Sequence, residues 1–282
     1  MGRSNISKST MWVYKGGNGL VLANCTFENP CGPTDLTDAG ASQLNNLLPN
    51  TVMYFNGGNY NALNVPGGTS PVTLQMGQSI HSRTADYSHP VSGTERSIFN
   101  GAFILPGNNT LDSITLLSTT DTADDTGVLI NGGNNNVINN SQIGNTRNTF
   151  TLGIVDNGQN TIINNSDIFS SKYALNMNGT SSSVLNSRVT AKGRNATGIY
   201  FYKNKTSNFV KNTQIQVIDG SGVPSGIYAD GSSVEVQDSI IQASGSRVRG
   251  IVSSYSSTIS IKNTQIHRRV TSTRGEINYV TL

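Results

Sequence analysis

A short phrase of apolar and polar positions recurs down the second half of the chain every 21 to 26 residues. An apolar residue is followed by Asn or Asp, then Ser or Thr, then one further residue, and then Ile or Val. The hydroxyl residues of its six copies are Ser141, Ser166, Ser187, Thr213, Ser239 and Thr264. A period of this length, made only of strand and turn residues, is typical of a solenoid in which each repeat forms one coil.

A second strand pattern lies about 13 to 15 residues before each hydroxyl. It usually opens with Gly and continues with Val, Ile or Leu, as in Gly127–Ile130, Gly198–Phe201 and Gly226–Ala229. No helix pattern interrupts these strands, which disfavours a layout with crossover helices. The two patterns together predict an all-β chain, a single-stranded right-handed parallel β-helix whose coils stack about 4.8 Å apart.

The Asn or Asp before each hydroxyl predicts a turn in the same place on every coil. Asn tolerates the left-handed backbone conformation best among residues with a side chain, and its amide can bond to neighbouring groups. Stacking would place these residues above one another, in the order Asn140, Asn165, Asn186, Asn212, Asp238 and Asn263. We expect an amide ladder, with the hydroxyls as a second row, so the repeated phrase carries structure and not chemistry.

The N-terminal region predicts the capped start of the solenoid. Residues 1–50 are expected to form an extension and a capping helix over Asp38–Leu48, which Pro49 ends. Residues 51–282 are expected to form the parallel β-helix, with about eight to nine coils. A solenoid needs such a cap because its first coil has an open strand edge.

The order of these elements resembles the pectate-lyase-like superfamily of β-helix proteins. Members often begin with a short helix, a strand rich in Val, Tyr and Phe, and a Gly-x-Tyr turn, matched here by Leu44–Leu48, Val52–Phe55 and Gly58–Tyr60. With the later repeats, the resemblance covers about residues 35–270. It implies the fold but no single activity, because the superfamily includes lyases, hydrolases, esterases, tailspikes and catalytically silent surface proteins.

Composition and charge narrow the setting and the partner. Only 35% of residues are apolar and 12% charged, which suits thin coils with many turns and resembles secreted bacterial surface proteins. Residues 1–169 hold six Lys/Arg and eleven Asp/Glu, a net charge of −5, whereas residues 170–282 hold thirteen and five, a net charge of +8. The basic half favours a polysaccharide or other anionic surface as partner, although a solvated face would have the same composition. We expect no nucleic-acid partner, because no binding module for it is recognised.

The location and assembly of the protein are inferred from the same features. No segment is apolar enough to span a membrane, and no signal peptide is visible, so an extracellular or cell-surface location follows only from the resemblance. Cys25 and Cys31 lie close in sequence and could form a local disulfide; two free thiols are the alternative. A monomer is favoured over a tailspike-like trimer.

Carboxylates before one of the coils are the candidates for catalysis or metal binding. Asp124, Asp125 and, one coil later, Asp156 are the catalytic candidates, and Asp121 joins Asp124 and Asp125 as a possible calcium cluster. No cofactor other than calcium is expected. The cluster faintly resembles the Asp pair of polygalacturonases, but their later Gly-His-Gly and Arg-Ile-Lys motifs have no counterpart in this chain. A plain polar turn is the alternative.

The segment His81–His89 contains every side-chain type that a hydrolase uses. It is also a loop beside the N-terminal cap, followed by Pro90, where such residues commonly bond to the backbone. Catalysis there would need a second, distant partner.

Aromatic and basic residues form the third group of candidates. Tyr200 and Tyr228 occupy the same outward position after the coil-opening Gly, Tyr202 points the same way, and Lys203 and Lys205 flank them. Exposed tyrosines beside cations can bind sugar rings. The alternative is that cross-strand tyrosine pairs simply stabilise a sheet.

Two function classes remain open. The first is an exported, non-catalytic surface or secreted protein that binds glycan or a host or cell surface, as an adhesin or virulence factor does. The second is a polysaccharide lyase or glycoside hydrolase acting on an acidic polysaccharide. Sparse carboxylates and the missing hydrolase motifs favour the first class.

Overall fold

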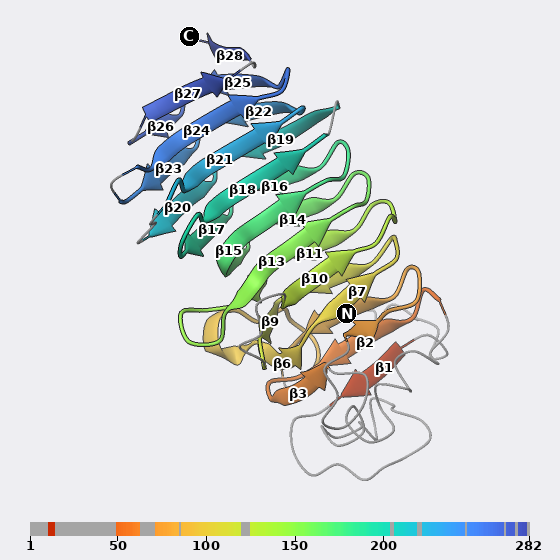
Figure 1. The fold of residues 1–282 in the computed structure, drawn as a ribbon. Coiled ribbons are helices and arrows are strands. Elements are labelled where there is room, and N and C mark those ends of the chain that lie inside the picture. Colours follow the sequence, from red (N-terminus) through yellow and green to blue (C-terminus); the bar gives the residue numbers. More distant parts are fainter. Residues whose placement is uncertain are drawn as a thin grey trace.

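A computed structural model of the 282-residue chain describes residues 11–14, 49–62, 71–84, 86–119, 125–203, 206–218, 222–245, 247–267, 269–273 and 276–280. These residues form an elongated stack of parallel strands, with β1 (Met11–Tyr14) and β28 (Glu276–Val280) at opposite ends of one sheet (Figure 1). The expected capping helix over Asp38–Leu48 and both cysteines lie outside the described residues, so these predictions stay predictions.

Successive strands of a coil lie on three faces of the solenoid, and each strand pairs with its counterparts on the neighbouring coils. The first face contains β1, β2 (Val52–Phe55), β5 (Ser79–Ser82), β8 (Thr110–Asp112), β11 (Val137–Asn139), β14 (Ile162–Asn164), β16 (Ser183–Leu185), β19 (Ser207–Lys211), β22 (Ser233–Gln237), β25 (Thr258–Lys262) and β28. The second face contains β3 (Asn59–Ala62), β6 (Ser97–Gly101), β9 (Ile114–Leu117), β12 (Gln142–Ile143), the start of β15 (Asp167–Met177), β17 (Arg188–Lys192), β20 (Gln214–Ile218), β23 (Ile240–Ala243) and β26 (Gln265–Ile266). The third face contains β4 (Val72–Thr73), β7 (Phe103–Leu105), β10 (Thr126–Ile130), β13 (Phe150–Asp156), the end of β15, β18 (Thr197–Tyr202), β21 (Ser225–Asp230), β24 (Arg249–Ser254) and β27 (Arg269–Thr273).

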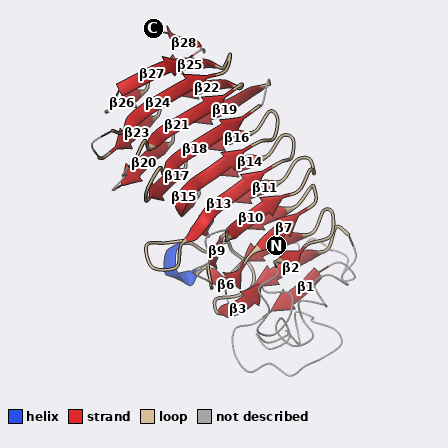
Figure 2. Ribbon diagram, in the orientation of Figure 1, coloured by secondary structure: helices blue, strands red, loops and turns tan. Residues whose placement is uncertain are grey.

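The second and third faces belong to one sheet because β15 is long enough to cross from one to the other. Its first residues pair with β17, and its last residues pair with β18. Within the described residues the one helical segment is the 3₁₀ turn Gly93–Glu95, and the rest of the secondary structure is strand (Figure 2). The prediction of an all-β parallel β-helix is therefore confirmed.

Apolar side chains fill the inside of the coils because strand residues alternate between the two sides of a sheet. On the first face the inward column runs through nine buried residues in register: Met53, Ile80, Leu111, Ile138, Ile163, Val184, Val210, Val236 and Ile261. Each fully buried aliphatic side chain of this kind stabilises the fold by roughly 1.5–3 kcal/mol. This continuous core holds the coils in register and so positions every outward side chain.

The predicted row of Asn residues lies at the corner between the first and second faces. All of its members have a positive φ, from 44° at Asn263 to 51° at Asp238. The amide of Asn212 donates to the side-chain oxygen of Asn186 at 2.8 Å, and the amide of Asn263 donates to Asp238 at 2.7 Å. Three of the five steps of the predicted amide ladder are hydrogen-bonded, since Asn165 also donates to Asn140. At the other two steps, Asn186 donates to Asn164 instead of to Asn165, and Asp238 has no amide with which to donate to Asn212.

The row of hydroxyls lies directly inside this corner and joins the coils to one another. Ser166 is 2% exposed, and its hydroxyl accepts the backbone N–H of Ser141 at 3.1 Å and donates to the Asn164 carbonyl at 2.8 Å. The same bond recurs between the backbone N–H of Ser166 and the hydroxyl of Ser187. Each hydroxyl thus satisfies buried backbone groups that the turn takes out of the strand ladder.

Candidate functional site

Four tyrosines lie side by side on the outward side of the third face. Tyr200 on β18 pairs in register with Tyr228 on β21, as counting from the coil-opening glycines predicts, and their ring centroids are 5.4 Å apart. The ring of Tyr200 also stacks on that of Tyr173 from β15, at 5.3 Å and an interplanar angle of 28°. Tyr202 lies 5.9 Å from Tyr200 along the same strand. We call Tyr173, Tyr200, Tyr202 and Tyr228 the tyrosine row.

Glycine packing sets the register of this row. A Cβ atom added to Gly198 would lie 2.5 Å from the Ile215 side chain and 2.6 Å from the Gly226 carbonyl oxygen. Any larger residue would therefore push the neighbouring coil away. Because Gly198 and Gly226 must lie directly over one another, the tyrosines two residues later also align.

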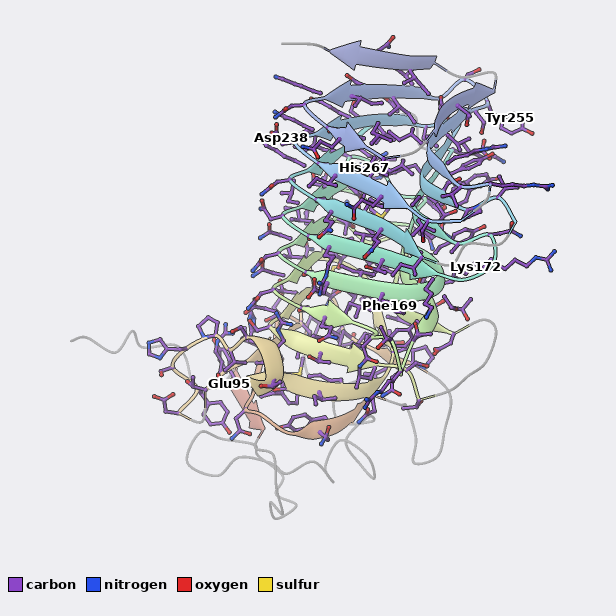
Figure 3. All side chains as sticks on the ribbon, turned by 90° about the vertical axis from the view of Figure 1, so that its left-hand side faces the viewer. Glu95, Phe169, Lys172, Asp238, Tyr255 and His267 are labelled. Atoms are coloured by element: carbon purple, nitrogen blue, oxygen red, sulfur yellow. The ribbon has the colours of Figure 1, made fainter. Side chains whose placement is uncertain are left out.

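Two lysine ammonium groups lie against the row. Lys172 Nζ is 5.3 Å from the ring centroid of Tyr173, and Lys203 Nζ is 4.8 Å from that of Tyr202. Both lysines are exposed, and Lys172 extends outward from the edge of the solenoid (Figure 3). These distances allow cation–π attraction, which holds each cation beside a phenol. Lys205, the other predicted cation, lies outside the described residues.

Hydrogen bonds fix two of the phenol groups. Tyr200 Oη donates to Asp230 Oδ2 at 3.4 Å, and Ser254 Oγ donates to Tyr228 Oη at 3.2 Å. Burial and the charge of Asp230 raise the pKa of Tyr200 well above its ordinary value, and a hydrogen bond with Tyr202 raises the pKa of Lys203. Tyr200 therefore keeps a neutral hydroxyl, and Lys203 a positive ammonium group, at neutral pH.

The ring faces of the row are largely occupied. Tyr200 stacks on Tyr173, and lysine ammonium groups lie over the rings of Tyr173 and Tyr202. A ligand would consequently meet hydroxyl and ammonium groups before it met a free ring face. This chemistry suits hydroxyls and anionic groups of a ligand better than the stacking of a sugar ring.

Three members of this site were missed from the sequence. Tyr173 and Lys172 lie immediately before Ala174, which takes the place of the coil-opening Gly, so a count forward from that position leads to Asn176 and does not reach them. Asp230 could have been found, because it lies four residues after Gly226 just as Tyr202 lies four residues after Gly198.

The structure separates the candidate catalytic carboxylates. Asp156 is fully buried and points inward, where its carboxylate accepts bonds from Gly158 N–H at 2.9 Å, Thr161 Oγ1 at 2.9 Å and Ser182 Oγ at 2.7 Å. It pairs in register with Ile130, the last residue of β10, whereas Asp125 precedes that strand. The two carboxylates therefore lie at opposite ends of a strand pair and do not form a catalytic pair.

Asp125 is bonded to the hydroxyl of Ser118, which belongs to the same connection between β9 and β10. Asp121 and Asp124 lie outside the described residues, so the calcium cluster stays a prediction. Among the described residues, no group of three or more His, Cys, Asp and Glu side chains could hold a metal ion.

Two residues of the segment His81–His89 contact Asp112, which lies in register with His81 on the neighbouring strand of the first face. Asp112 Oδ2 lies 3.2 Å from His81 Nδ1 and accepts a bond from Arg83 Nη1 at 2.9 Å. Asn139 donates to the other carboxylate oxygen at 2.9 Å, and Arg83 also lies 5.6 Å over the Tyr54 ring. These contacts lower the pKa of Asp112, although its burial acts in the opposite direction. The cluster ties the start of the 83–96 loop to the solenoid.

Comparisons with known proteins were made for the sequence and for the fold. No family model matches the chain, and no curated protein matches its sequence. A rhamnogalacturonan lyase matches the structure with a TM-score of 0.59 at 15% identity, over 89% of this chain and 73% of that one. The fold is a parallel β-helix, as in this lyase.

Two further structures match less well. An alginate lyase from Paenibacillus sp. str. FPU-7 has a TM-score of 0.49 at 14% identity, over 86% of this chain and 97% of that one. The pectate lyase Pel9A has a TM-score of 0.48 at 11% identity, over 96% and 78%. At such identities the similarity describes the fold and leaves the activity to the residues of this chain. No described helix has the length and hydropathy of a membrane span.

Proposed function

We propose that this protein is an exported, non-catalytic β-helix that binds an acidic polysaccharide along the tyrosine row. The observation that carries the proposal is the placement of two exposed ammonium groups, Lys172 and Lys203, beside four clustered phenols. Carboxylate or sulfate groups of the glycan would meet the ammonium groups, and its hydroxyls would meet the phenols.

The direction of the row sets the direction of the glycan. Tyr200 and Tyr228 lie in register on neighbouring strands, whereas Tyr173 lies in register with Thr197, three residues before Tyr200. An extended polysaccharide that contacts all three would therefore cross the strands obliquely. The net charge of +8 in residues 170–282 attracts such a polyanion to this half of the molecule.

The alternative function is a polysaccharide lyase or glycoside hydrolase on the same surface. Asp230 favours it, because this carboxylate lies within hydrogen-bond reach of Tyr200 and on the strand next to Lys203. The raised pKa of Tyr200 opposes it, since a phenol that resists deprotonation is a poor general base.

A binding and cleavage assay tests the proposal. Purified protein is passed over immobilised polygalacturonate, alginate and neutral dextran, with and without calcium, while soluble glycan is assayed for reducing ends and unsaturated products. We expect retention on the acidic glycans without product, and weaker retention of the Lys172→Gln/Lys203→Gln variant.

Two matched controls accompany this assay. Lys262→Gln removes a partly exposed cation from the first face, and Tyr255→Phe removes the hydroxyl of a tyrosine that is 62% exposed outside the row. Both should be retained like the unmodified protein. Formation of product would favour the enzymatic alternative over the proposal. If Lys262→Gln loses as much retention as Lys172→Gln/Lys203→Gln, the binding is non-specific charge attraction.

A further inference from the structure

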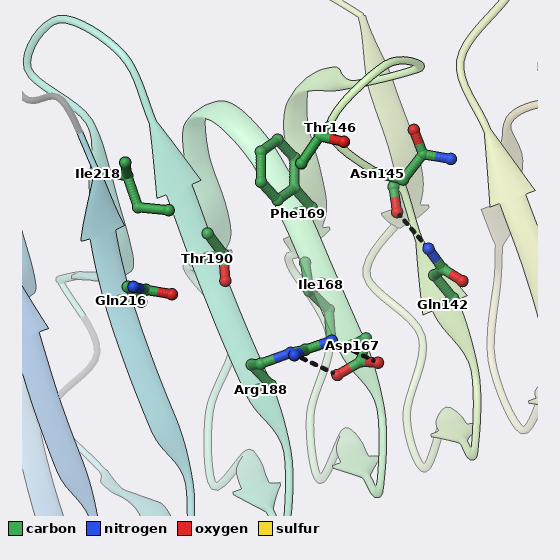
Figure 4. Close-up of a pocket in the computed structure, with 11 residues that line it drawn as sticks. Gln142, Asn145, Thr146, Asp167, Ile168, Phe169, Arg188, Thr190, Gln216 and Ile218 are labelled. Atoms are coloured by element: carbon green, nitrogen blue, oxygen red, sulfur yellow. Dashed lines mark hydrogen bonds and ion pairs between the residues drawn. The ribbon is translucent and has the colours of Figure 1, made fainter. Parts of the chain in front are cut away.

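A hollow of about 280 Å³ lies on the second face (Figure 4). Its floor comes from three coils in register, with Phe169 on β15, Thr190 on β17 and Gln216 on β20. Asn145 and Thr146, from the connection that follows β12, form one wall. The volume is just below the roughly 300–1,000 Å³ that small-molecule sites occupy, which suits a ligand as small as one sugar ring.

We infer that this hollow is a second carbohydrate site, which takes a single uncharged sugar ring. We call it the Phe169 pocket, after the residue on its floor that lies on the face turned toward the viewer in Figure 3. Its chemistry differs from that of the tyrosine row, so the inference does not depend on the proposed function.

The Phe169 ring supplies the apolar part of the site. Phe169 points outward from β15 and is half-buried, and within the described residues no other aromatic ring packs against it. A half-buried aromatic ring on the floor of a hollow that polar side chains also line can cover the C–H groups of a sugar ring. In the tyrosine row, by contrast, ring faces are occupied by neighbours.

The pair Asp167–Arg188 supplies the charged part. Arg188 Nε donates to Asp167 Oδ1 and Arg188 Nη2 donates to Asp167 Oδ2, both at 3.1 Å, and about half of each side chain is exposed. The carboxylate keeps free lone pairs and the guanidinium keeps free N–H groups, so the pair can accept from one hydroxyl and donate to its neighbour. Because the two charges of the pair balance each other, the pair itself gives little net attraction for an anionic ligand.

Amide groups complete the polar lining. Gln142 lies beside Asp167 in register, with its amide donating to the Gly144 carbonyl at 3.3 Å, and Gln216 lies beside Thr190. Both side chains point outward, and Gln142 uses one amide N–H on the turn while its amide oxygen stays available as an acceptor. Amides that both donate and accept suit sugar hydroxyls.

Ligand-observed NMR on the whole chain tests the inference. The probes are the methyl glycosides of glucose, galactose, mannose, rhamnose and N-acetylglucosamine. The methyl glycoside of galacturonic acid, with its carboxylate free, is the charged comparison. We expect at least one neutral glycoside to bind better than the charged one, and Phe169→Ala to weaken that binding about tenfold. Asp167→Asn, which keeps the shape of the side chain, should weaken it as well.

The controls separate this site from surface adhesion and from the tyrosine row. Ile240→Ala shortens another exposed apolar residue of the second face, 37% exposed, and should leave binding unchanged. Tyr200→Phe should leave it unchanged too. The inference is overturned if no neutral glycoside binds, or if Ile240→Ala weakens binding as much as Phe169→Ala. It is also overturned if only the Tyr200→Phe variant loses the sugar, since binding would then belong to the tyrosine row.

Discussion

Two rows of stacked side chains run along this solenoid, and they differ in what they do for the backbone. In the Asn row every member has a positive φ, and the adjacent buried hydroxyls bond to backbone groups of neighbouring coils. In the tyrosine row the side chains contact one another, two lysines and Asp230, and the hydrogen bonds of Tyr200 and Tyr228 join them to the side chains of Asp230 and Ser254.

The difference shows that vertical stacking does not by itself indicate a functional site. Any residue type that recurs at one position of a coil will stack, because the coils repeat at the strand spacing. A row is a candidate for binding where the turn geometry and the buried hydrogen bonds do not require its residues. By that criterion the Asn and hydroxyl rows are structural, and the tyrosine row is free to serve binding.

Replacing Asp156 should have the largest effect on stability, because its carboxylate accepts three hydrogen bonds from buried groups. Asp156→Ala would leave the Gly158 N–H and the hydroxyls of Thr161 and Ser182 without their acceptor. We expect the free energy of unfolding in urea to fall by about 3 kcal/mol. The exposed carboxylate of Glu235 is the control, and Glu235→Ala should change the value by less than about 0.5 kcal/mol. Equal effects would mean that Asp156 does not support the core.

Ser166 should have the next largest effect. Ser166→Ala removes the acceptor for the buried Ser141 N–H and the donor to the Asn164 carbonyl. The expected loss is about 2 kcal/mol in the same unfolding experiment. Ser183, a partly exposed serine on the next coil, is the control position, and Ser183→Ala should cost less than half as much.

Asn165 separates the backbone role from the hydrogen bond. It has a φ of 48° and donates to Asn140 at 3.3 Å. Asn165→Ala should cost about 1 kcal/mol or more, because alanine is strained in this conformation, whereas Asn165→Gly keeps the conformation and should cost less. If glycine is the worse replacement, the amide bond matters more than the backbone conformation.

The tyrosine row should show the smallest effect on stability and no pH dependence of binding near neutrality. The raised pKa of Tyr200 keeps its phenol neutral, and the raised pKa of Lys203 keeps its ammonium charged, to a higher pH than in the isolated side chains. Retention on an acidic polysaccharide should therefore be constant from about pH 6 to pH 9. A fall within that range would show that other groups control binding.

The fold was predictable from the sequence because its determinants are local and repeat. The glycines that align Tyr200 with Tyr228 and the Asn residues with positive φ recur at matching positions in successive coils. Side-chain pairs between coils that do not contain the repeated phrase were not predictable in the same way. His81 and Asp112 lie in register on β5 and β8, 31 residues apart, and the sequence did not indicate their pairing.

The sites were only partly predictable for the same reason. β15 continues through the edge between two faces without a loop, so it carries Phe169 to one site and Tyr173 to the other. Alternation along the strand did not predict whether the Asp156 side chain points inward or outward. It points inward, because three hydrogen-bond donors in the interior hold its carboxylate. The Phe169 pocket depends on the connection after β12, whose residues Asn145 and Thr146 line it, and the repeated phrase does not describe that connection.

The role of the tyrosine row is tested most directly by measuring binding and stability on one triple variant, Tyr200→Phe/Tyr228→Phe/Lys203→Gln. We expect at least a tenfold loss of retention on polygalacturonate or alginate, with a free energy of unfolding within about 1 kcal/mol of the unmodified protein. Unchanged retention, together with a loss of stability like that of Ser166→Ala, would instead make the tyrosine row a structural element of the sheet.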